Sequence, residues 1–340
     1  MPVRLAEVAR RAGVSEATAS RVLSGRGYVS AGSRERVRAA AQALEYVPHS
    51  AARALSRART ATIALLVHHA QYPLGSEGTF PARVVHGITR HLRDAGHDLL
   101  YVVVDDAAVT NLDRLPAVRR GRSDGVLVLG PTFSQDAIRT LHAAGRPVVL
   151  IDNRVPEPGV PSVMADNLPA VEALTTHLLD VHGYRRIACL AGPPDWPSTA
   201  ERVAGYRAAM AARALQPQIV HAQSTTAAEG VAQAERWLGV PPEAIVAVND
   251  ALAIGALSYL RRWASRPAVV GFDDIAWARL TDPPLTTVSV DGELMGAHAA
   301  ALILERIEGG GAGPSTVVRI PAVPRIRGSC GCDPAGELSL

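Results

Sequence analysis

Apolar residues near the N-terminus recur at the spacing of an amphipathic helix. Four of them occupy positions i, i+3, i+4 and i+7, which predicts a helix with one buried face. They are Leu5, Val8, Ala9 and Ala12. Gly13 comes directly after this pattern, where a helix C-terminus favours a positive φ, so we expect the first helix to end there.

Two more short helices are predicted before residue 46. Ser15 is placed to cap a second helix that runs to about Ser24, and Ser30 or Ser33 is placed to cap a third. The apolar faces of these helices consist of Ala19, Val22 and Leu23 in the second and Val37, Ala40, Ala41 and Leu44 in the third. Two helices joined by a tight turn and braced by a third predict a helix-turn-helix.

From Thr60 onward, short apolar runs of strand length alternate with helical patterns. The expected strands are Ile63–Val67, Leu99–Val104, Gly125–Leu129, Pro147–Ile151, Ile187–Ala191, Ala244–Val248 and Ala268–Gly271. The expected helices are Ala82–Ala95, Asp113–Arg120, Ser134–Ala144, Leu168–His182, Thr199–Arg213, Thr226–Leu238 and Ala251–Arg262. Such alternation predicts parallel sheets with helices on both faces. The expected fold class is therefore a small all-α helix-turn-helix head followed by an α/β core.

Composition excludes several classes of protein. The chain has 340 residues, of which 48% are hydrophobic and 20% charged, so it can bury a core and is neither a disordered chain nor a coiled coil. No apolar run approaches the ~18 residues of a membrane helix, and the N-terminus carries no signal-peptide core, so we expect a cytoplasmic protein. Three cysteines do not make a disulfide framework.

Charge divides the chain into a basic head and a mildly acidic body. Eleven Arg and four Glu fall within residues 1–59, a net charge of +7, which leaves −4 for the remainder of a chain whose total is +3. There is no Lys. A small basic head indicates that this part meets a polyanion and that the body has another task.

Polar and aromatic residues follow the predicted strands directly. In open parallel sheets, ligands bind beyond the carboxyl ends of the strands. The residues that this rule selects are Phe80, Asp152, Pro193, Asp195, Trp196, Asn249, Asp250, Phe272 and Asp273. Acceptors, an amide and aromatic rings at one rim suit a polyhydroxylated or heterocyclic ligand. For Asp152 and Asp250 the alternative is a helix cap, and for Phe272 it is the core.

The head resembles the N-terminal signature of the lactose-repressor (LacI/GalR) family of bacterial transcription factors. The resemblance rests on the run from Leu5 to Ser24, LAEVARRAGVSEATASRVLS, and continues through Val29-Ser30, Arg34–Val37, Leu44–Pro48 and Ala52–Leu55. Ala19 departs from the pattern, because the family usually has a β-branched residue there. The resemblance implies a helix-turn-helix domain over residues 1–46 and a hinge helix or linker over residues 47–59.

The same resemblance implies the contacts with DNA. The second helix would enter the major groove, where Glu16, Ala17 and Arg21 would read bases, Arg21 through two hydrogen bonds to guanine. The alternatives are that Arg21 touches only phosphate and that Glu16 is solvated. The residues expected to cap the helix or to contact phosphate are Ser15, Thr18, Ser20, Arg34 and Arg53. Leu55 would insert as a wedge in the minor groove.

The body resembles the effector domain of that family, which is similar to periplasmic sugar-binding proteins. The resemblance rests on Ser123–Val126, Asp166-Asn167, His182–Ala188, Ala191–Pro193, Arg202–Tyr206, Val248–Asp250, Gly271–Asp273, Leu285–Val288 and Arg325–Ser329. It implies two subdomains, one of residues 60–157 and 288–321 and one of residues 158–287 and 322–330, with a flexible tail over residues 331–340. The effector-binding residues that it implies are Phe80, Asp152, Trp196, Ser198, Arg202, Asn249 and Asp273.

These observations predict a homodimeric DNA-binding transcriptional regulator, most often a repressor in this family, whose affinity for a pseudo-palindromic operator is controlled by a small molecule. Two carboxylates and an Arg favour a sugar, since a purine site needs more stacking aromatic rings. A nucleobase effector and a ligand-independent regulator with a vestigial cleft remain the alternatives. We expect no enzyme, cofactor or metal. Cys330-Gly-Cys332 supplies only two of the four ligands of a structural zinc site, so a mobile tail is favoured there.

Overall fold

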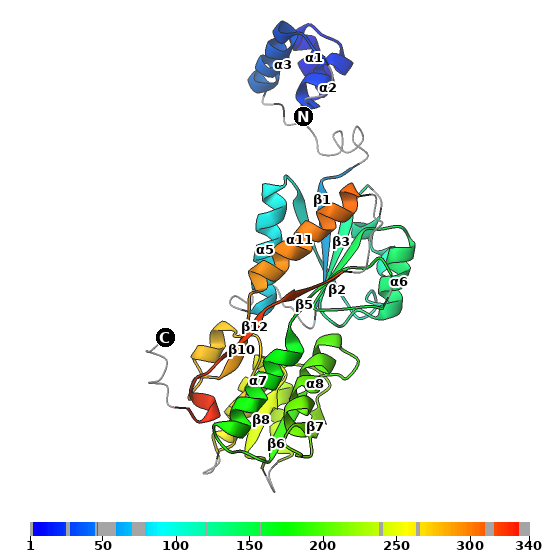
Figure 1. The fold of residues 1–340 in the computed structure, drawn as a ribbon. Coiled ribbons are helices and arrows are strands. Elements are labelled where there is room, and N and C mark those ends of the chain that lie inside the picture. The colour runs from blue at the N-terminus through cyan, green and yellow to red at the C-terminus, as the bar shows by residue number, and fades with distance from the viewer. Residues whose placement is uncertain are drawn as a thin grey trace. The chain divides into compact units, whose positions relative to one another are not determined.

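The computed structural model describes residues 3–24, 28–44, 46, 59–69, 79–119, 121–156, 158–237, 241–262, 266–309 and 316–332. The chain forms two compact units. One comprises Met1–Ala61 with Arg120–Asp124, and the other comprises Thr62–Arg119 with Gly125–Leu340. Figure 1 labels most of the elements of both units.

The N-terminal unit contains the three predicted helices, α1 (Leu5–Ala12), α2 (Glu16–Ser24) and α3 (Ala31–Ala43). α1 ends at Gly13, whose φ of 64° lies in the left-handed region, as the sequence predicts. The Ser15 hydroxyl accepts from the backbone N–H of Thr18 at 3.2 Å and caps α2. Of the two candidates for the third cap, the structure selects Ser30, which accepts from the Ser33 N–H.

A small apolar core holds these three helices together. Its buried members are Val8, Ala9, Ala12, Ala19, Val22, Val37, Ala40 and Ala41. Ala19 is fully buried, so the small side chain at this position does contribute to the core. Arg36 on α3 donates from Nε to the carbonyl of Ala12 at 3.2 Å, which satisfies a carbonyl at the C-terminus of α1. The predicted loop 25–27, most of the hinge (47–58), and with it Arg53 and Leu55, lie outside the described residues.

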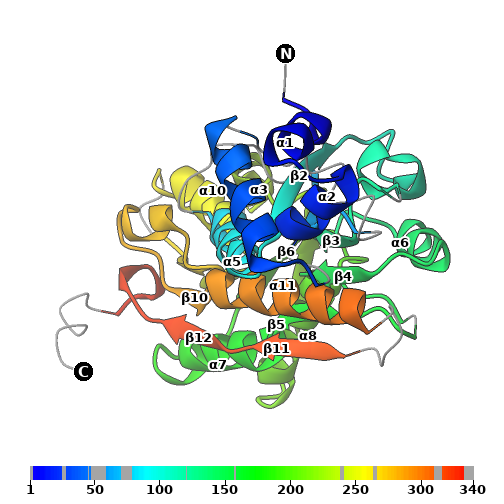
Figure 2. The same cartoon turned by 90° about the horizontal axis from the view of Figure 1, so that it is seen from above.

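The first sheet of the larger unit has six parallel strands in the order β11-β5-β4-β3-β1-β2. Their bounds are β1 Thr62–His68, β2 Asp98–Val104, β3 Gly125–Leu129, β4 Val148–Ile151, β5 Ser162–Ala165 and β11 Val317–Ile320. Successive side chains alternate between the two faces. Leu65 and Leu127 pack in one apolar cluster with α5 (Phe80–Asp94) and α11 (Gly292–Glu308), whereas Leu66 and Val128 pack in a second cluster with α6 (Gln135–Ala143). Figure 2 shows α11 lying across the sheet.

The second sheet has four parallel strands in the order β7-β6-β8-β9. Their bounds are β6 Ile187–Ala191, β7 Gln218–His221, β8 Ala244–Ala247 and β9 Ala268–Val270. The helices of this part are α7 (Asn167–Asp180), α8 (Pro197–Ala211), α9 (Ala227–Glu235) and α10 (Asp250–Leu260). A separate antiparallel pair joins β10 (Thr287–Val290) to β12 (Ala322–Arg325). The βα alternation read from the sequence is therefore present in both sheets.

Two expectations about the chain path are wrong. Asp113–Arg120 is not a helix but two short 3-10 turns, Leu112–Arg114 and Pro116–Val118, because Pro116 lacks the N–H that a continuing helix needs. The expected crossing near residue 158 falls before β5, yet β5 pairs with β4 in the first sheet, so the chain stays with that sheet to Ala165. Among the described residues, no helix is long and apolar enough to cross a membrane.

Candidate functional site

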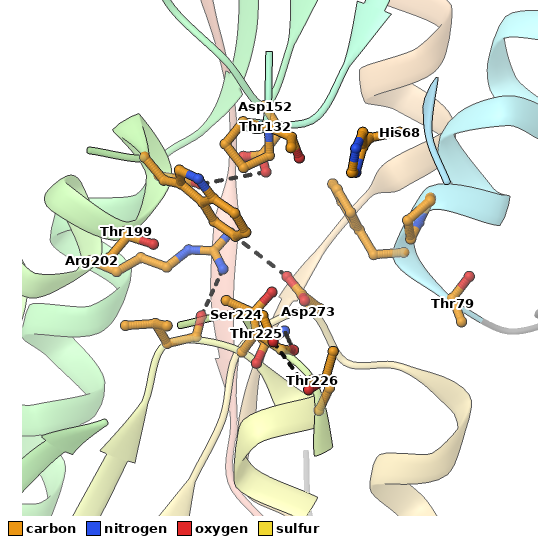
Figure 3. A pocket seen from close by; sticks show the side chains of 18 of the residues that line it. His68, Thr79, Thr132, Asp152, Thr199, Arg202, Ser224, Thr225, Thr226 and Asp273 are labelled. Carbon is orange, nitrogen blue, oxygen red and sulfur yellow. Dashed lines mark hydrogen bonds and ion pairs between the residues drawn. The ribbon is translucent and has the colours of Figure 1, made fainter. Parts of the chain in front are cut away.

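The carboxyl ends of strands from both sheets meet at one cavity of about 540 Å³. This volume lies within the range of small-molecule pockets, about 300–1,000 Å³. All seven residues predicted to contact an effector line it, namely Phe80, Asp152, Trp196, Ser198, Arg202, Asn249 and Asp273. The rule that ligands bind beyond strand ends selects five of these residues, and the family resemblance adds Ser198 and Arg202. The fold thus brings together side chains that lie almost 200 positions apart in sequence. Figure 3 shows the cavity with Asp152 and Asp273 on opposite sides.

Arg202 on α8 is held by four contacts. Its Nε donates to the Asn167 side-chain oxygen at 2.8 Å and one terminal nitrogen donates to the Val248 carbonyl at 2.7 Å. The guanidinium carbon lies 3.7 Å from the centre of the Phe272 ring, in a cation–π contact. The second terminal nitrogen lies 3.7 Å from a carboxylate oxygen of Asp273. The charged group is thus fixed before any ligand binds.

The two cavity carboxylates sit on unusual backbone. Asp152 has a φ of 54° and Asp273 a φ of 115°, values that non-glycine residues rarely adopt. Strain of this kind costs of order 1–3 kcal/mol and persists where the surrounding structure fixes the residue. Here the Asp273 N–H donates to the Val288 carbonyl at 2.8 Å, and Arg83 donates to the Asp273 carbonyl. The backbone is held so that both carboxyl groups line the cavity.

Burial also changes the ionisation of these two groups. It raises the pKa of Asp152 to about 6, with the Arg202 charge and a hydrogen bond from Ser198 acting in the opposite direction. It raises the pKa of Asp273 to about 7, again against the Arg202 charge. Each carboxyl group therefore gives up protons near neutral pH, and hydrogen-bond donors on a ligand would favour the ionised forms.

Three buried polar atoms of the cavity have no hydrogen-bond partner among the described residues. They are Oδ1 of Asp152, the hydroxyl of Thr132 and Nδ1 of His68. Oδ2 of Asp152, by contrast, accepts from the Ser198 hydroxyl at 3.4 Å. Leaving a buried polar group unpaired costs about 1–3 kcal/mol. A polar ligand that supplied these partners would recover that cost on binding.

The remaining predicted residues divide between walls and supports. Phe80 is buried at the start of α5, and Trp196 is half-buried directly before α8, so each gives the cavity an apolar wall. Asn249 is largely committed to the protein, since its oxygen caps α10 through the Leu252 N–H and its amide nitrogen donates to the Thr225 carbonyl. Phe272 is a core residue beneath Arg202, which was the alternative weighed for it.

Asp250, the other acid at this rim, is buried within the protein. Its carboxylate accepts from the Thr287 hydroxyl and from the Ile275 N–H at 2.9 Å. Burial, together with the nearby Asp273 charge, raises the pKa of Asp250 to about 8. It does not line the cavity and supports the strand ends that do.

Several lining residues were not found from the sequence. One group of lining residues follows β7 and consists of Ser224, Thr225 and Thr226. Because β7 is short, half-exposed and without a strong apolar run, the sequence did not predict this strand or the residues at its end. Thr132 also lines the cavity. It comes three residues after β3, so the strand-end rule could have selected it. His68 at the end of β1 also lines the cavity, with its Nε2 2.9 Å from Asp106.

The head presents the predicted face of α2 to its surroundings. Glu16, Ala17 and Arg21 are exposed, while Ala19 and Val22 point into the core. Ser15 and Arg34 are also exposed, whereas Thr18 and Ser20 are half-buried. The Thr18 hydroxyl lies 2.9 Å from that of Ser15, so both residues take part in the cap. The face required for groove contact is therefore available.

Comparison with known proteins places both units in one family. The family described as bacterial regulatory proteins, lacI family, matches residues 4–49, and the periplasmic binding proteins and sugar binding domain of LacI family match residues 60–327. The chain belongs to the LacI family. The HTH-type transcriptional regulator CelR of Thermobifida fusca is 36% identical to it over 313 residues, 89% of this chain and 91% of that protein.

Solved structures of LacI-family proteins match over nearly the whole chain. The lac repressor dimer bound to operator and the anti-inducer ONPF has a TM-score of 0.82 at 28% identity and covers 97% of this chain and 99% of its own. The transcriptional regulator CelR–cellobiose complex has a TM-score of 0.71 at 32% identity, with 96% and 99% covered. The predicted fold class and the prediction of a DNA-binding transcriptional regulator, rather than an enzyme, are confirmed.

Proposed function

We propose that this LacI-family regulator is a homodimeric repressor that binds a pseudo-palindromic operator in the cytoplasm. Its affinity for the operator falls or rises when a sugar occupies the cavity. The observation that carries the proposal is the pair of cavity carboxyl groups, buried Asp152 and half-buried Asp273, on either side of the fixed Arg202 guanidinium. The unpaired Asp152 Oδ1 and Thr132 hydroxyl add two positions where a ligand would make hydrogen bonds.

The chemistry of the cavity favours a sugar over a nucleobase. Ionised carboxylates are acceptors only, and a sugar offers many hydroxyl donors, each forming a charge-assisted bond that is about twice as strong as a neutral one. Phe80 and Trp196 are suited to the apolar face of a sugar ring. The structure of the related CelR holds cellobiose, which supports the same class of ligand here. We infer that Arg202, Ser198 and Asn249 orient the sugar.

On the DNA side, we assign base contacts to Glu16, Ala17 and Arg21, the exposed residues of α2. We assign phosphate contacts to Arg34 and helix capping beside the backbone to Ser15, Thr18 and Ser20. The body is proposed to consist of two subdomains, one built on the six-stranded sheet with α11 and one on the four-stranded sheet with the β10–β12 pair. A change at the cavity that both sheets line would be the origin of control over the operator.

A thermal-shift screen tests this proposal directly. The purified chain is heated with sugars, sugar phosphates and nucleobases in turn, since a ligand at 100 times its Kd stabilises a protein by about 2.7 kcal/mol. We expect a sugar to raise the melting temperature of the wild-type chain and of Asp136→Ala, an exposed acid on α6. We expect no shift for Asp273→Ala.

The other outcomes identify the alternatives. A shift with nucleobases and none with sugars would replace the sugar by a nucleobase as the effector. No shift with any class, while operator binding is intact, would mean a ligand-independent regulator whose cavity residues are structural. An equal shift in Asp273→Ala would place the ligand outside this cavity.

A further inference from the structure

Four side chains of metal-ligating type converge at the end of α7, on the part of the larger unit built on the four-stranded sheet. His177 lies in the last turn of α7, His182 follows two residues after the helix ends, and Cys330 and Cys332 lie at the C-terminal end of the described chain. Their potential ligand atoms all lie within 4.8 Å of one another. None of these residues takes part in the cavity or in the DNA-facing helix.

The distances among three of these atoms, the two histidine Nε2 atoms and Sγ of Cys332, match tetrahedral zinc. The Nε2 atoms of His177 and His182 are 3.3 Å apart. Sγ of Cys332 lies 3.5 Å from Nε2 of His177 and 3.3 Å from Nε2 of His182. Zinc bonds of ~2.05 Å to nitrogen and ~2.3 Å to sulfur at tetrahedral angles separate two nitrogens by ~3.3 Å and a nitrogen from a sulfur by ~3.6 Å. These three atoms, each of which carries a lone pair, thus already lie at three corners of a coordination tetrahedron.

Hydrogen bonding alone explains this triangle poorly. Each of the three contacts among the two imidazole nitrogens and the thiol would need its own proton, placed between the two atoms it joins. Two protons directed toward the middle of the triangle would repel each other. A cation at the centre satisfies all the lone pairs at once, with the Cys330 sulfur as the fourth ligand. That sulfur also accepts from the Thr286 hydroxyl at 3.2 Å, the kind of outer hydrogen bond that stabilises a metal-bound thiolate.

The chain is shaped to bring the two cysteines to this point. Gly331 between them has a φ of 103°, which only glycine adopts without strain, and a Cβ there would lie 3.1 Å from the Tyr184 hydroxyl. Tyr184 stacks on the His182 ring at 5.5 Å between centroids, and its hydroxyl donates to the Cys330 carbonyl. Cys330 is fully buried, which contradicts the expectation that the Cys-Gly-Cys segment is a mobile tail.

We propose that His177, His182, Cys330 and Cys332 bind a single structural zinc ion. Four protein ligands close the coordination sphere, which is the pattern of a structural rather than a catalytic site. The spacing His-x4-His is ordinary for zinc, and the short Cys-x-Cys spacing is made possible by Gly331. The ion would tie the C-terminal segment to the end of α7, two parts of the chain separated by about 150 residues.

The sequence alone could not indicate this site, because the two histidines and the two cysteines lie far apart in the chain and neither pair is sufficient. Only the fold brings the second pair of ligands to the first.

Metal analysis of the full chain, purified without a polyhistidine tag and reconstituted with zinc, tests the proposal. We expect one zinc per chain in the wild type and in Cys189→Ala, which removes the buried cysteine outside the cluster. His69→Ala should also keep its zinc and controls for metal held by the other group of potential ligands, His68, His69 and Asp106. Cys332→Ser and His182→Gln should lose it.

Cobalt(II) substitution provides a second measurement that requires no variant to fold. The wild-type chain with cobalt should show the intense visible bands of a tetrahedral ion together with thiolate-to-cobalt charge transfer. A chelator should abolish these bands and lower the melting temperature of the zinc-loaded chain. Absence of bound zinc and cobalt in the wild type, or undiminished binding by Cys332→Ser, would overturn the proposal.

Discussion

The residues to which ligand binding is assigned are also residues whose conformation or burial destabilises the unliganded fold. Asp152 and Asp273 combine a positive φ with burial, and Asp152 keeps one oxygen without a partner. Strained and unsatisfied groups of this kind cluster at ligand-binding sites, where a ligand can supply the missing hydrogen-bond partner. This pattern predicts that improving the stability of the cavity will weaken its binding of ligand.

Asp152→Asn tests that trade-off. Asn tolerates the left-handed backbone and removes a buried carboxylate, so the free energy of unfolding of the unliganded chain at pH 8 should stay the same or rise. Affinity for the sugar should fall by about 10–100-fold, because hydrogen bonds to a charged group contribute about 1.5–3 kcal/mol. Chemical denaturation and calorimetric titration measure the two effects. An unchanged Kd would exclude Asp152 from the binding site.

The raised pKa values of the buried acids predict how stability depends on pH. Asp152, Asp273 and Asp250 have folded pKa values of about 6, 7 and 8, above the ~3.9 of an unfolded Asp, so the folded chain binds more protons. Their contribution to stability is fully present below about pH 4 and is lost as pH rises through these folded values to about 8.

Comparison with a variant isolates the effect of the acids. The double variant Asp152→Asn with Asp273→Asn should lose less stability than the wild type between pH 5 and pH 8, as measured by denaturant unfolding. Identical pH profiles for the two proteins would show that neither carboxyl group titrates in this range.

Five of the cavity residues were predictable because one geometric rule selects them, whereas Ser198 and Arg202 were implied only by the family resemblance. Asp152, Asn249 and Asp273 each follow a strongly apolar strand, and in parallel sheets those strand ends share an edge. The Ser224–Thr226 run escaped because β7 is polar and half-exposed. No sequence pattern indicates that Asn249 is largely occupied by its own helix and Thr225, since that depends on packing between segments.

At the scale of elements, α5 and α11 approach so closely that glycine is required at their contact. A Cβ on Gly87 would lie 2.0 Å from the Glu293 carbonyl oxygen, and one on Gly296 would lie 2.1 Å from that of Val84. Both obstacles are backbone atoms, which have no alternative rotamer. The pair packs against the first sheet, so its spacing is fixed from both sides.

Gly296→Ala should therefore destabilise the chain despite the better helix propensity of Ala. Overpacking costs about 1–3 kcal/mol, which exceeds the ~1 kcal/mol gained from replacing a helical Gly. His298→Ala, at an exposed position of the same helix, should leave the midpoint of denaturant unfolding nearly unchanged. If Gly296→Ala were as stable as the wild type, the two helices would have to be further apart than the structure places them.

The second helix of the head carries a separate prediction. Arg21→Ala should weaken operator binding by about 1–3 kcal/mol and relax the preference at a single base pair, because its fork matches guanine. Arg34→Ala should instead weaken binding to operator and random DNA alike and reduce the salt dependence by about one ion. Fluorescence anisotropy at several salt concentrations separates the two. Equal losses on both DNAs for Arg21→Ala would assign it to phosphate.

Helices and strands with a clear period were predicted to within a few residues, and caps were predicted where a Ser stands before the pattern. The short strands β5, β7, β10, β11 and β12 were missed because four residues carry little periodicity, and three of these strands are wholly or partly exposed. The expected chain crossing near residue 158 was wrong because β5 pairs with β4 in the first sheet. The sheet that such a short strand joins depends on partners distant in sequence, which the strand's own residues do not reveal.

At the scale of the whole molecule, one chain contains a DNA-binding unit and a unit with the proposed ligand-binding cavity. Control of one site by the other is a coupling free energy, typically about 1–3 kcal/mol, and it is reciprocal. If the sugar changes operator affinity by a given factor, operator DNA must change sugar affinity by the same factor. The cavity and the α2 face are the two sites between which this coupling would act.

Operator binding with and without the sugar found in the screen tests the central claim most directly. Anisotropy titrations of the wild-type chain should give operator Kd values that differ by about 5–150-fold between the two conditions. In Asp273→Asn the two values should coincide at the Kd of the unliganded wild type. An operator Kd that does not respond to a sugar bound in the wild-type cavity would contradict the account.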